Sequence, residues 1–390
     1  MGQSGPLDSI RVLDLSSVVM GPLGAQILGD LGADVISVED REGNTNRVMG
    51  PGPHPELSGI ALNLLRNKRS IGLDLKAPAG RDAFLRLAAT CDVVITNLRP
   101  APLARLRLTY DDLRLVRPDI VLCRAHGYST PSGRADAPAF DDIMQSEGAV
   151  GDLFSRMGID PILFPTLLVD KVAGLTIAYA VLAALVQRAH TGEGQDVEVP
   201  MADVTRAFLL VEHGAGAIAV PPQGPAGYER ILTRERRPQR TADGLMNLLP
   251  YTEAHYDALF RAGGRPDLVG DARFATRSAR IANGDGLYRE VASVLGQRST
   301  ADWLAFCGQH GIPASRSGTL DELVENLPEA SHPHAGRYRV IPQPVRFSSG
   351  PTPLRRHAPL VGEHSREVLA EVGYNEAEID ELVAAGVLHA

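Results

Sequence analysis

Short β-rich runs alternate with helix-like stretches along the first 200 residues of this chain. The strand signals lie at 9–15 (SIRVLDL), 34–39 (DVISVE), 69–75 (RSIGLDL), 92–97 (DVVITN), 119–127 (DIVLCRAHG) and 195–201 (QDVEVPM). Apolar residues repeat at helical spacing between them, at 22–31, 79–91 and 109–117. Because strands joined by crossover helices run side by side in one direction, this alternation predicts an α/β domain built on a parallel sheet.

The rest of the chain changes composition twice. A helix is predicted over 170–191, ended by Gly192 as a glycine C-cap. Residues 216–240 are rich in Pro, Gly and Arg, which is typical of a linker, and amphipathic helices fill most of 241–330. Since 390 residues exceed one ordinary core, we expect a large domain over 1–215, then the linker, then a small domain over 241–330.

Charge and cysteine content restrict the partners of such a chain. The formal net charge of -8 disfavours nucleic-acid binding, which needs Lys and Arg over a broad face. Three dispersed cysteines, Cys91, Cys123 and Cys307, indicate reduced, buried thiols. No export signal is visible, and the longest apolar run, 174–186, is shorter than the roughly 20 residues that cross a bilayer. We therefore expect a cytoplasmic protein that binds neither nucleic acid nor membrane.

A dinucleotide site is one candidate for the turn after the first strand. Glu39, which ends the second strand, resembles the acid that holds an NAD ribose. However, Gly21, Gly24 and Gly29 do not form GxGxxG, and the turn SSVVMGP is too bulky for a pyrophosphate, so the pattern disfavours NAD. The sequence contains no HExxH, GxSxG, DxD or zinc-ligand pair, and we predict no metal site.

Basic residues at predicted strand and helix ends indicate a phosphorylated ligand instead. In α/β sheets, ligands lie beyond the carboxyl ends of the strands, where Arg, Lys and helix N-termini bind phosphate. The candidates for these phosphate contacts are Arg41, Lys68, Arg69, Arg99, Arg105 and Arg124. Ordinary solvated surface charge is the alternative for each of them.

Asp170 lies where the run FPTLLV meets the apolar helix DKVAGLTIAYAVLAAL. A carboxylate in such surroundings costs free energy unless its charge is stabilised. One interpretation is an N-cap of the helix. The other is a nucleophile that the helix dipole keeps ionised and that attacks an activated acyl group. His126 and His213 are candidates for proton transfer, and the pattern alone leaves these roles open.

Six ordered blocks together span nearly all of the chain. They are IRVLDLSSVVMGPLGAQILGDLGADVISVE, NKRSIGLDLK, DVVITNLRPAPLARL, HGYSTPSG with AFDDIMQ, DKVAGLTIAYAVLAALVQRAHTGEGQDVEVPM, and APLVGEHSREVLAEVG. These blocks resemble the class III CoA-transferase family, which contains formyl-CoA transferase, carnitine CoA-transferase and the α-methylacyl-CoA racemases. The resemblance implies a Rossmann-like large domain completed by C-terminal residues about 335–390, a smaller middle domain, and an interlocked homodimer.

For activity, the resemblance implies transfer of CoA from an acyl-CoA donor to a free carboxylic acid, with Asp170 as nucleophile. The implied cycle passes through a mixed anhydride and an aspartyl-CoA thioester, so no tightly bound cofactor or metal is expected. Arg105 and Arg41 match positions at the CoA phosphates, and His126 lies where some members have a CoA-binding lysine. Val19 replaces a glutamine near the substrate of formyl-CoA transferase, which disfavours formyl and oxalyl groups here.

Two alternative functions remain open. In the racemase branch an Asp and the His of a GHDxxY block move the α-proton, but here Phe140 stands at the histidine position in AFDD. A non-catalytic acyl-CoA binder would keep the phosphate contacts and use Asp170 only as a cap. Family members take oxyanion donors from a glycine loop in the small domain, and TADGLMNLLP has no such run, so we assign no oxyanion donors.

Overall fold

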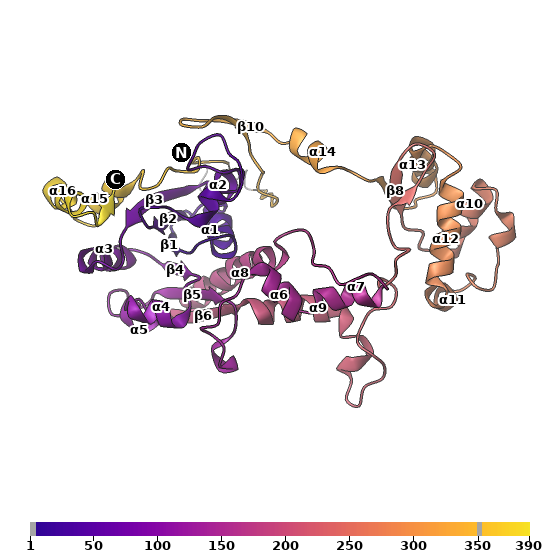
Figure 1. The fold of residues 1–390 in the computed structure, drawn as a ribbon, viewed down its shortest axis with the longest axis horizontal. Coiled ribbons are helices and arrows are strands. Elements are labelled where there is room, and N and C mark those ends of the chain that lie inside the picture. Colours follow the sequence, from indigo (N-terminus) through magenta and orange to yellow (C-terminus); the bar gives the residue numbers. More distant parts are fainter. Residues whose placement is uncertain (1–4, 349–352) are drawn as a thin grey trace. The chain divides into compact units, whose positions relative to one another are not determined.

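The computed structural model describes residues 5–348 and 353–390. The chain divides into two compact units, each considered by itself below (Figure 1). The larger unit comprises Met1–Gly148, Phe164–Phe208 and Leu327–Ala390. The smaller unit comprises Ala149–Leu163 and Leu209–Asn326. The larger unit is therefore discontinuous in sequence.

A seven-stranded sheet in the order β12-β3-β2-β1-β4-β5-β6 forms the centre of the larger unit. The strands are β1 (Arg11–Leu15), β2 (Asp34–Glu39), β3 (Lys68–Leu73), β4 (Val93–Thr96), β5 (Val121–His126), β6 (Gln195–Pro200) and β12 (Leu388–His389). All neighbours pair in parallel except β12, which is antiparallel to β3. The predicted α/β fold with a parallel sheet is confirmed, and the order 3-2-1-4-5-6 is that of a Rossmann sheet.

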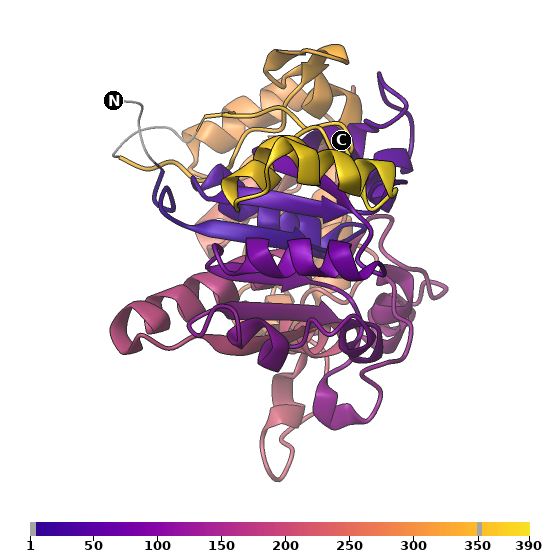
Figure 2. The same cartoon turned by 90° about the vertical axis from the view of Figure 1, so that its left-hand side faces the viewer.

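Helices cover both faces of this sheet. On one face lie α1 (Met20–Asp30), α6 (Asp141–Glu147) and α8 (Leu168–Thr191). On the other lie α3 (Pro78–Ala88), α4 (Pro100–Arg105), α5 (Tyr110–Arg114), α15 (Ser365–Glu371) and α16 (Glu376–Ala384). Figure 2 shows the two yellow C-terminal helices beside the indigo strands, so residues from the two ends of the chain share one core.

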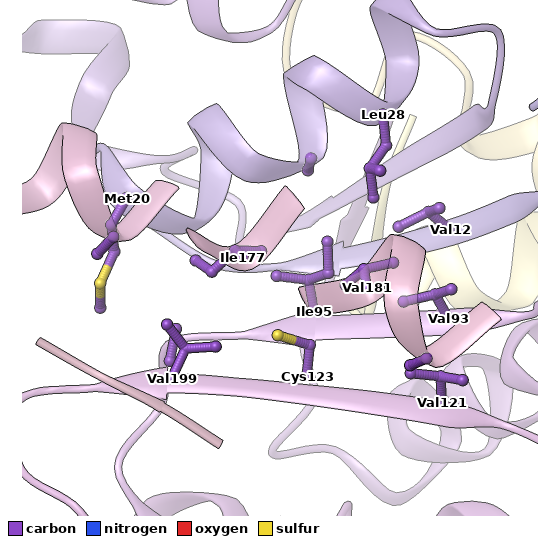
Figure 3. Close-up of a cluster of buried hydrophobic side chains, with 14 of the residues drawn as sticks. Val12, Met20, Leu28, Val93, Ile95, Val121, Cys123, Ile177, Val181 and Val199 are labelled. Carbon is purple, nitrogen blue, oxygen red and sulfur yellow. The ribbon is translucent and has the colours of Figure 1, made fainter. Parts of the chain in front are cut away.

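Alternating side chains along the strands build a separate apolar core on each face. Val12 joins the core under α1 and α8, whereas Leu13, its neighbour in β1, points to the opposite core. Figure 3 shows the first core, in which Ile177 and Val181 of α8 face Ile95 and the other strand residues. This alternation is the period of two expected for a pleated strand. Both faces must be covered for such strands to be stable.

Two glycines allow α1 and α8 to approach each other closely. A Cβ atom on Gly24 of α1 would lie 2.5 Å from Ile177 Cγ2, and one on Gly174 of α8 would lie 2.9 Å from Leu23 Cδ2. Such distances are too short for a real contact, so neither position tolerates a larger residue without movement of a helix. The start of α8 is thereby held at a fixed distance from α1.

The capacity of α8 to span a bilayer differs from the expectation drawn from the sequence. With 24 residues, α8 is long and apolar enough to cross a bilayer, and no other helix among residues 5–348 and 353–390 passes this test. The expectation that its apolar run is too short for this is wrong. Half of its most apolar window is buried inside the structure, as in the core helix of a soluble protein. Packing against α1 and the sheet accounts for this composition. Its predicted glycine C-cap, Gly192 with φ of 76°, is confirmed.

The smaller unit has its own core, in which Trp303 is fully buried and donates a hydrogen bond from Nε1 to the Leu295 carbonyl, 2.9 Å away. Its strands are β7 (Gln239–Arg240), β8 (Leu245–Leu248) and β9 (Ala314–Arg316), which form an antiparallel sheet. Its helices are α7 (Val150–Arg156), α10 (Glu253–Ala262), α11 (Arg277–Ala282), α12 (Gly284–Leu295), α13 (Thr300–Gln309) and α14 (Leu320–Glu325).

The remaining elements are short or join the two units. They are α2 (Gly59–Leu64), α9 (Met201–His213), β10 (Glu329–His332) and β11 (Gly336–Arg339). The last two strands form an antiparallel hairpin within the larger unit.

A buried ion pair ties the sheet together across β2. Lys68 of β3 and Asp14 of β1 have side chains with no exposed surface, and Lys68 Nζ lies 2.7 Å from Asp14 Oδ2. The ammonium group also donates to the Pro22 carbonyl at 2.9 Å, and the Ser16 hydroxyl donates to the second Asp14 oxygen. Each charge is therefore compensated by its partner and by hydrogen bonds, as burial requires.

We expect Lys68→Met to lower the free energy of unfolding by about 3–5 kcal/mol, because it leaves the Asp14 carboxylate buried without its partner. Chemical denaturation followed by circular dichroism would measure this loss. Lys76→Met is the matched control, since Lys76 is exposed, and should stay within about 0.5 kcal/mol of the unaltered protein. Equal losses for the two variants would contradict the structural role of Lys68.

Candidate active site

The topology brings five of the candidate residues to one edge of the sheet. Val19 follows β1, Arg41 follows β2, Arg99 follows β4, and His126 ends β5. The carboxyl ends of these parallel strands lie at the same edge. Because α8 leads into β6, which is parallel to β5, its N-terminus with Asp170 is at this edge as well. Ligands of open α/β sheets bind at this edge.

Asp170 lies in the first turn of α8 and does not cap it. The helix begins at Leu168, its N-cap position is Leu167, and no side chain caps it. The N-cap interpretation of Asp170 is therefore wrong, because the helix starts two residues earlier than the sequence indicated. The Asp170 side chain is buried, with 7% of the residue exposed.

Asp141 and Gln145 of α6 hold the segment that leads into Asp170. Asp141 Oδ1 accepts a hydrogen bond from the Asp170 backbone N–H at 3.0 Å. Gln145 donates to Asp141 Oδ2 at 2.6 Å and to the Thr166 carbonyl at 3.2 Å, and its amide oxygen accepts from the Phe164 N–H at 2.9 Å. Neither residue was predicted from the sequence as part of the site. The block AFDDIMQ contains them, but nothing local indicated which residue they contact.

The surroundings of Asp170 raise the pKa of its carboxyl group to about 6, first through burial and second through the charge of Asp141. Burial and the charge of Asp141 thus outweigh the expected stabilisation of the ionised form by the helix N-terminus. The neighbouring ammonium group of Lys171 donates to the Thr166 hydroxyl. At neutral pH the carboxylate is mostly ionised, yet poorly solvated and repelled by a second carboxylate. Such a group becomes more stable when it loses its charge in a covalent bond, which suits a nucleophile.

The turn between β1 and α1 has a strained backbone. Val18 has φ of 68°, a left-handed conformation that is rare for a β-branched residue. Asn44 accepts from the Val18 N–H at 3.1 Å, and Asn46 donates to the Val18 carbonyl at 3.2 Å. Asn97 accepts from the Ser17 N–H at 3.0 Å and donates to the Ser17 carbonyl at 2.8 Å. Strain of this kind is retained at functional sites when surrounding contacts enforce it. The sequence pattern did not predict this backbone strain.

Arg41 and Arg105 are the candidate phosphate contacts that remain available. Both side chains are exposed, Arg41 after β2 and Arg105 in the last turn of α4. Within the described part of the chain, neither is in an ion pair. Arg99 is also exposed and donates to the Asp136 carbonyl at 2.7 Å. These guanidinium groups can meet a phosphate without breaking an existing charge pair.

Three other basic candidates have structural partners instead. Lys68 forms the buried ion pair with Asp14. Arg69 is buried and paired with Asp34, Glu367 and Glu371 at 2.6, 2.9 and 2.6 Å. Arg124 is paired with Asp196 at 2.8 Å. We therefore reassign all three from CoA phosphate contacts to the framework of the sheet, since a phosphate would have to displace their carboxylates.

His126 and His213 are both buried, and His126 does not act as a cation. His126 is 1% exposed, and its Nε2 lies 3.2 Å from Glu198 Oε1 without the angle of a hydrogen bond. Burial lowers the pKa of His126 below its ordinary value despite the attraction of Glu198, so the ring is neutral at pH 7. This leaves His126 without the charge of the lysine whose position it occupies. His213 is also buried, and its Nδ1 accepts from the Tyr228 N–H at 3.2 Å.

Glu39, Phe140 and Val19, which bear on the alternative ligands and reactions, lie in three different environments. Glu39 is buried, and hydrogen bonds from Arg47 at 2.6 Å and Ser70 at 2.7 Å occupy its carboxylate. Burial would raise the pKa of Glu39, but these donors hold it below its usual value, and no ribose can reach the carboxylate. Phe140 is 65% exposed and precedes α6, next to Asp141. Val19 is buried at the start of α1.

No group of three or more His, Cys, Asp or Glu side chains among the described residues is arranged to hold a metal ion. The three cysteines are buried, free thiols. Their burial raises the pKa of Cys91 and Cys123 to about 12, so neither is a thiolate at neutral pH.

Comparison with known proteins places this geometry in a family. Residues 7–365 match the family model of CoA-transferase family III. A probable fatty acyl-CoA transferase of Mycobacterium tuberculosis is 32% identical, over 94% of this chain and 98% of the relative. A succinate–glutarate CoA-transferase of Agrobacterium fabrum is 30% identical, over 94% and 96%. The crystal structure of a CAIB/BAIF family protein from Brucella suis superposes with a TM-score of 0.81, at 27% identity, covering 95% of this chain and all of that chain. The chain therefore belongs to CoA-transferase family III.

Proposed function

We propose that this protein moves CoA from an acyl-CoA donor to a free carboxylic acid, with Asp170 as the nucleophile. The observation that carries the proposal is a buried carboxylate, repelled by Asp141, at the carboxyl edge of a Rossmann sheet. Relatives that are named for CoA transfer to glutarate support this reaction class. Arg41 and Arg105 would hold the CoA phosphates near that edge, because they are exposed and unpaired within the described ranges.

The first half of the cycle would transfer CoA to the enzyme. An Asp170 carboxylate oxygen attacks the thioester carbonyl carbon, the C–S bond breaks, and CoA thiolate and a mixed anhydride form. The thiolate then attacks the aspartyl carbonyl carbon of the anhydride, which releases the donor acid as a carboxylate. Asp170 is left as an uncharged CoA thioester, which removes the buried negative charge beside Asp141.

The second half repeats these steps in reverse order. The acceptor carboxylate attacks the Asp170 thioester, which gives CoA thiolate and a new mixed anhydride. The thiolate attacks the acceptor's carbonyl carbon and releases the Asp170 carboxylate together with the new acyl-CoA. One thioester is broken and one is formed, so the proposed cycle needs no ATP, metal or tightly bound cofactor.

We further propose that the protein acts as a homodimer that covers one face of α8. Leu175, Tyr179 and Val186 are 58%, 64% and 58% exposed in one chain. Their spacing of four and seven residues puts them on one side of the helix. A row of large apolar side chains in solvent is typical of a protein interface. The resemblance to interlocked dimers gives a second copy of this chain as the partner.

Peptide mass spectrometry after incubation with acyl-CoA and hydroxylamine tests the covalent step. Hydroxylamine cleaves an aspartyl thioester, so we expect a hydroxamate on Asp170. Asp170→Asn should lose the adduct and at least about 10³-fold in kcat, since the nucleophile is gone. Asp142→Asn is the matched control, because Asp142 is exposed in α6, and should retain both. An adduct that persists in Asp170→Asn would refute the assignment; no adduct from any donor would favour a racemase or an acyl-CoA-binding protein.

The pH dependence of kcat/KM tests the electrostatics of the site. Only ionised Asp170 can attack, so the rate should fall as pH drops through about 6. In Asp141→Asn the repulsion disappears while burial remains, so the pKa of Asp170 falls and the midpoint shifts to lower pH. Asp142→Asn should leave the midpoint in place. A midpoint that is unchanged or higher in Asp141→Asn would show that Asp141 does not raise the pKa of Asp170.

Light scattering coupled to size-exclusion chromatography tests the dimer. We expect a mass of twice the chain's 41.7 kDa. Leu175→Asp should reduce the yield of this species, because it puts a charge in the apolar face of α8. Gln187→Asp, at an exposed polar position of the same helix, should not reduce it. A monomer at micromolar concentration would exclude the proposed assembly.

A further inference from the structure

One cavity lies wholly within the smaller unit, whereas Asp170 belongs to the larger one. It has a volume of about 660 Å³ and is bounded by α10, α11, the start of α12 and the segment 229–233. The three helices are labelled in Figure 1 and drawn in orange tones. This volume is in the range of sites for small organic molecules, which is roughly 300–1,000 Å³, and well above that of a single inorganic ion.

The lining of this cavity is strongly basic for an acidic protein. Five arginines line it, against two carboxylates, Glu229 and Asp285. The five are Arg230, Arg273, Arg277, Arg280 and Arg289. Asp285 is already engaged by the Thr233 hydroxyl. The cavity therefore carries a surplus of positive charge in a chain whose net charge is -8.

Most of these guanidinium groups are available to a ligand. Arg273 is paired with Asp271 at 2.6 Å, but the other four have no carboxylate within ion-pair distance in the described part of the unit. Arg280 and Arg289 each donate one hydrogen bond to a backbone carbonyl, at 2.8 and 3.2 Å. Arg277 and Arg289 are exposed. Unpaired guanidinium groups gathered around one cavity are suited to bidentate binding of phosphate oxygens.

Aromatic rings supply a second kind of recognition. Tyr251, Tyr256 and Tyr288 line the cavity with the arginines. The Arg230 guanidinium lies 5.5 Å from the centre of the Tyr251 ring, and that of Arg280 lies 5.3 Å from the Tyr256 ring. Burial raises the pKa of Tyr256 to about 12, so its hydroxyl remains a donor at neutral pH. Planar rings beside guanidinium groups can stack a flat heterocycle while the cations bind its charged group.

We propose that this cavity binds a small organic phosphate with a planar ring, a ligand of the nucleotide class. The volume accommodates a ring and its phosphates, the unpaired arginines match the charge, and the tyrosines match the ring. The lining of the site includes none of the residues proposed for acyl transfer, Asp170, Arg41 and Arg105.

Calorimetric titration of the full-length protein with ADP tests this site. We expect saturable binding by ADP and at least tenfold weaker binding by adenosine, which keeps the ring but lacks the phosphates. Arg277→Gln and Arg289→Gln should each weaken ADP binding by about tenfold, since each removes a charged donor. Arg236→Gln is the matched control, because Arg236 is exposed in the same unit outside the cavity, and should bind ADP normally. Unchanged thermal unfolding of the variants would show that they remain folded.

Other results would overturn the proposal. No ADP binding at millimolar concentration would remove the site. Equal affinity in the unaltered protein and in the Arg277→Gln/Arg289→Gln double variant would place ADP elsewhere. Loss of ADP binding in Arg105→Gln but not in the double variant would assign ADP to the edge of the large sheet. Equal affinity for adenosine and ADP would show that the arginines do not select the ligand.

Discussion

The close packing of α8 against α1 is the contact on which the position of the candidate active site depends. Gly24 and Gly174 let the two helices approach until the side chains of Leu23 and Ile177 fill the space that a Cβ would need. Because α8 also covers the sheet between β5 and β6, its first turn has little freedom to move. Asp170 lies four residues before Gly174, so the same contact that forms the core fixes the proposed nucleophile. A protein interior packed this densely transmits a change in volume directly to the site.

The candidate site combines two features that lower stability. One is the pair of buried carboxylates, Asp170 and Asp141, and the other is the left-handed backbone of Val18. Both are enforced by hydrogen bonds from neighbouring segments: the amide of Gln145 in α6 fixes the first, and the asparagines after β2 and β4 fix the second. The two apolar cores and the compensated buried ion pairs elsewhere in the domain offset the free-energy cost of these two features. Concentrating unfavourable geometry where chemistry is proposed is a common property of enzymes.

The local sequence pattern correctly predicted the elements whose conformation is set by neighbouring residues. The six parallel strands follow from apolar runs of four to six residues, and Gly192 ends α8 because its left-handed conformation suits glycine. The pattern did not predict the role of a residue where that role is set by contacts with residues distant in the sequence. Lys68 at the start of a strand looks like a loop cation until Asp14 is placed beside it. Asp170 looks like an N-cap until the helix is seen to begin at Leu168. The role of Asp141 depends on a contact 29 residues along the chain, and β12 has only two residues, too few for any periodicity.

The division of the chain also constrains the order in which the protein forms during synthesis. Residues 209–326 of the smaller unit make a continuous segment, and its core can assemble once that segment has left the ribosome. The larger sheet cannot be completed then, because β12, which pairs with β3, follows it in the chain by more than 300 residues. Until that pairing, the outer edge of β3 presents unpaired backbone groups to other chains. Contacts of such long sequence separation form slowly, so the edge of β3 stays open to other chains for longer than the edges between strands that are close in sequence.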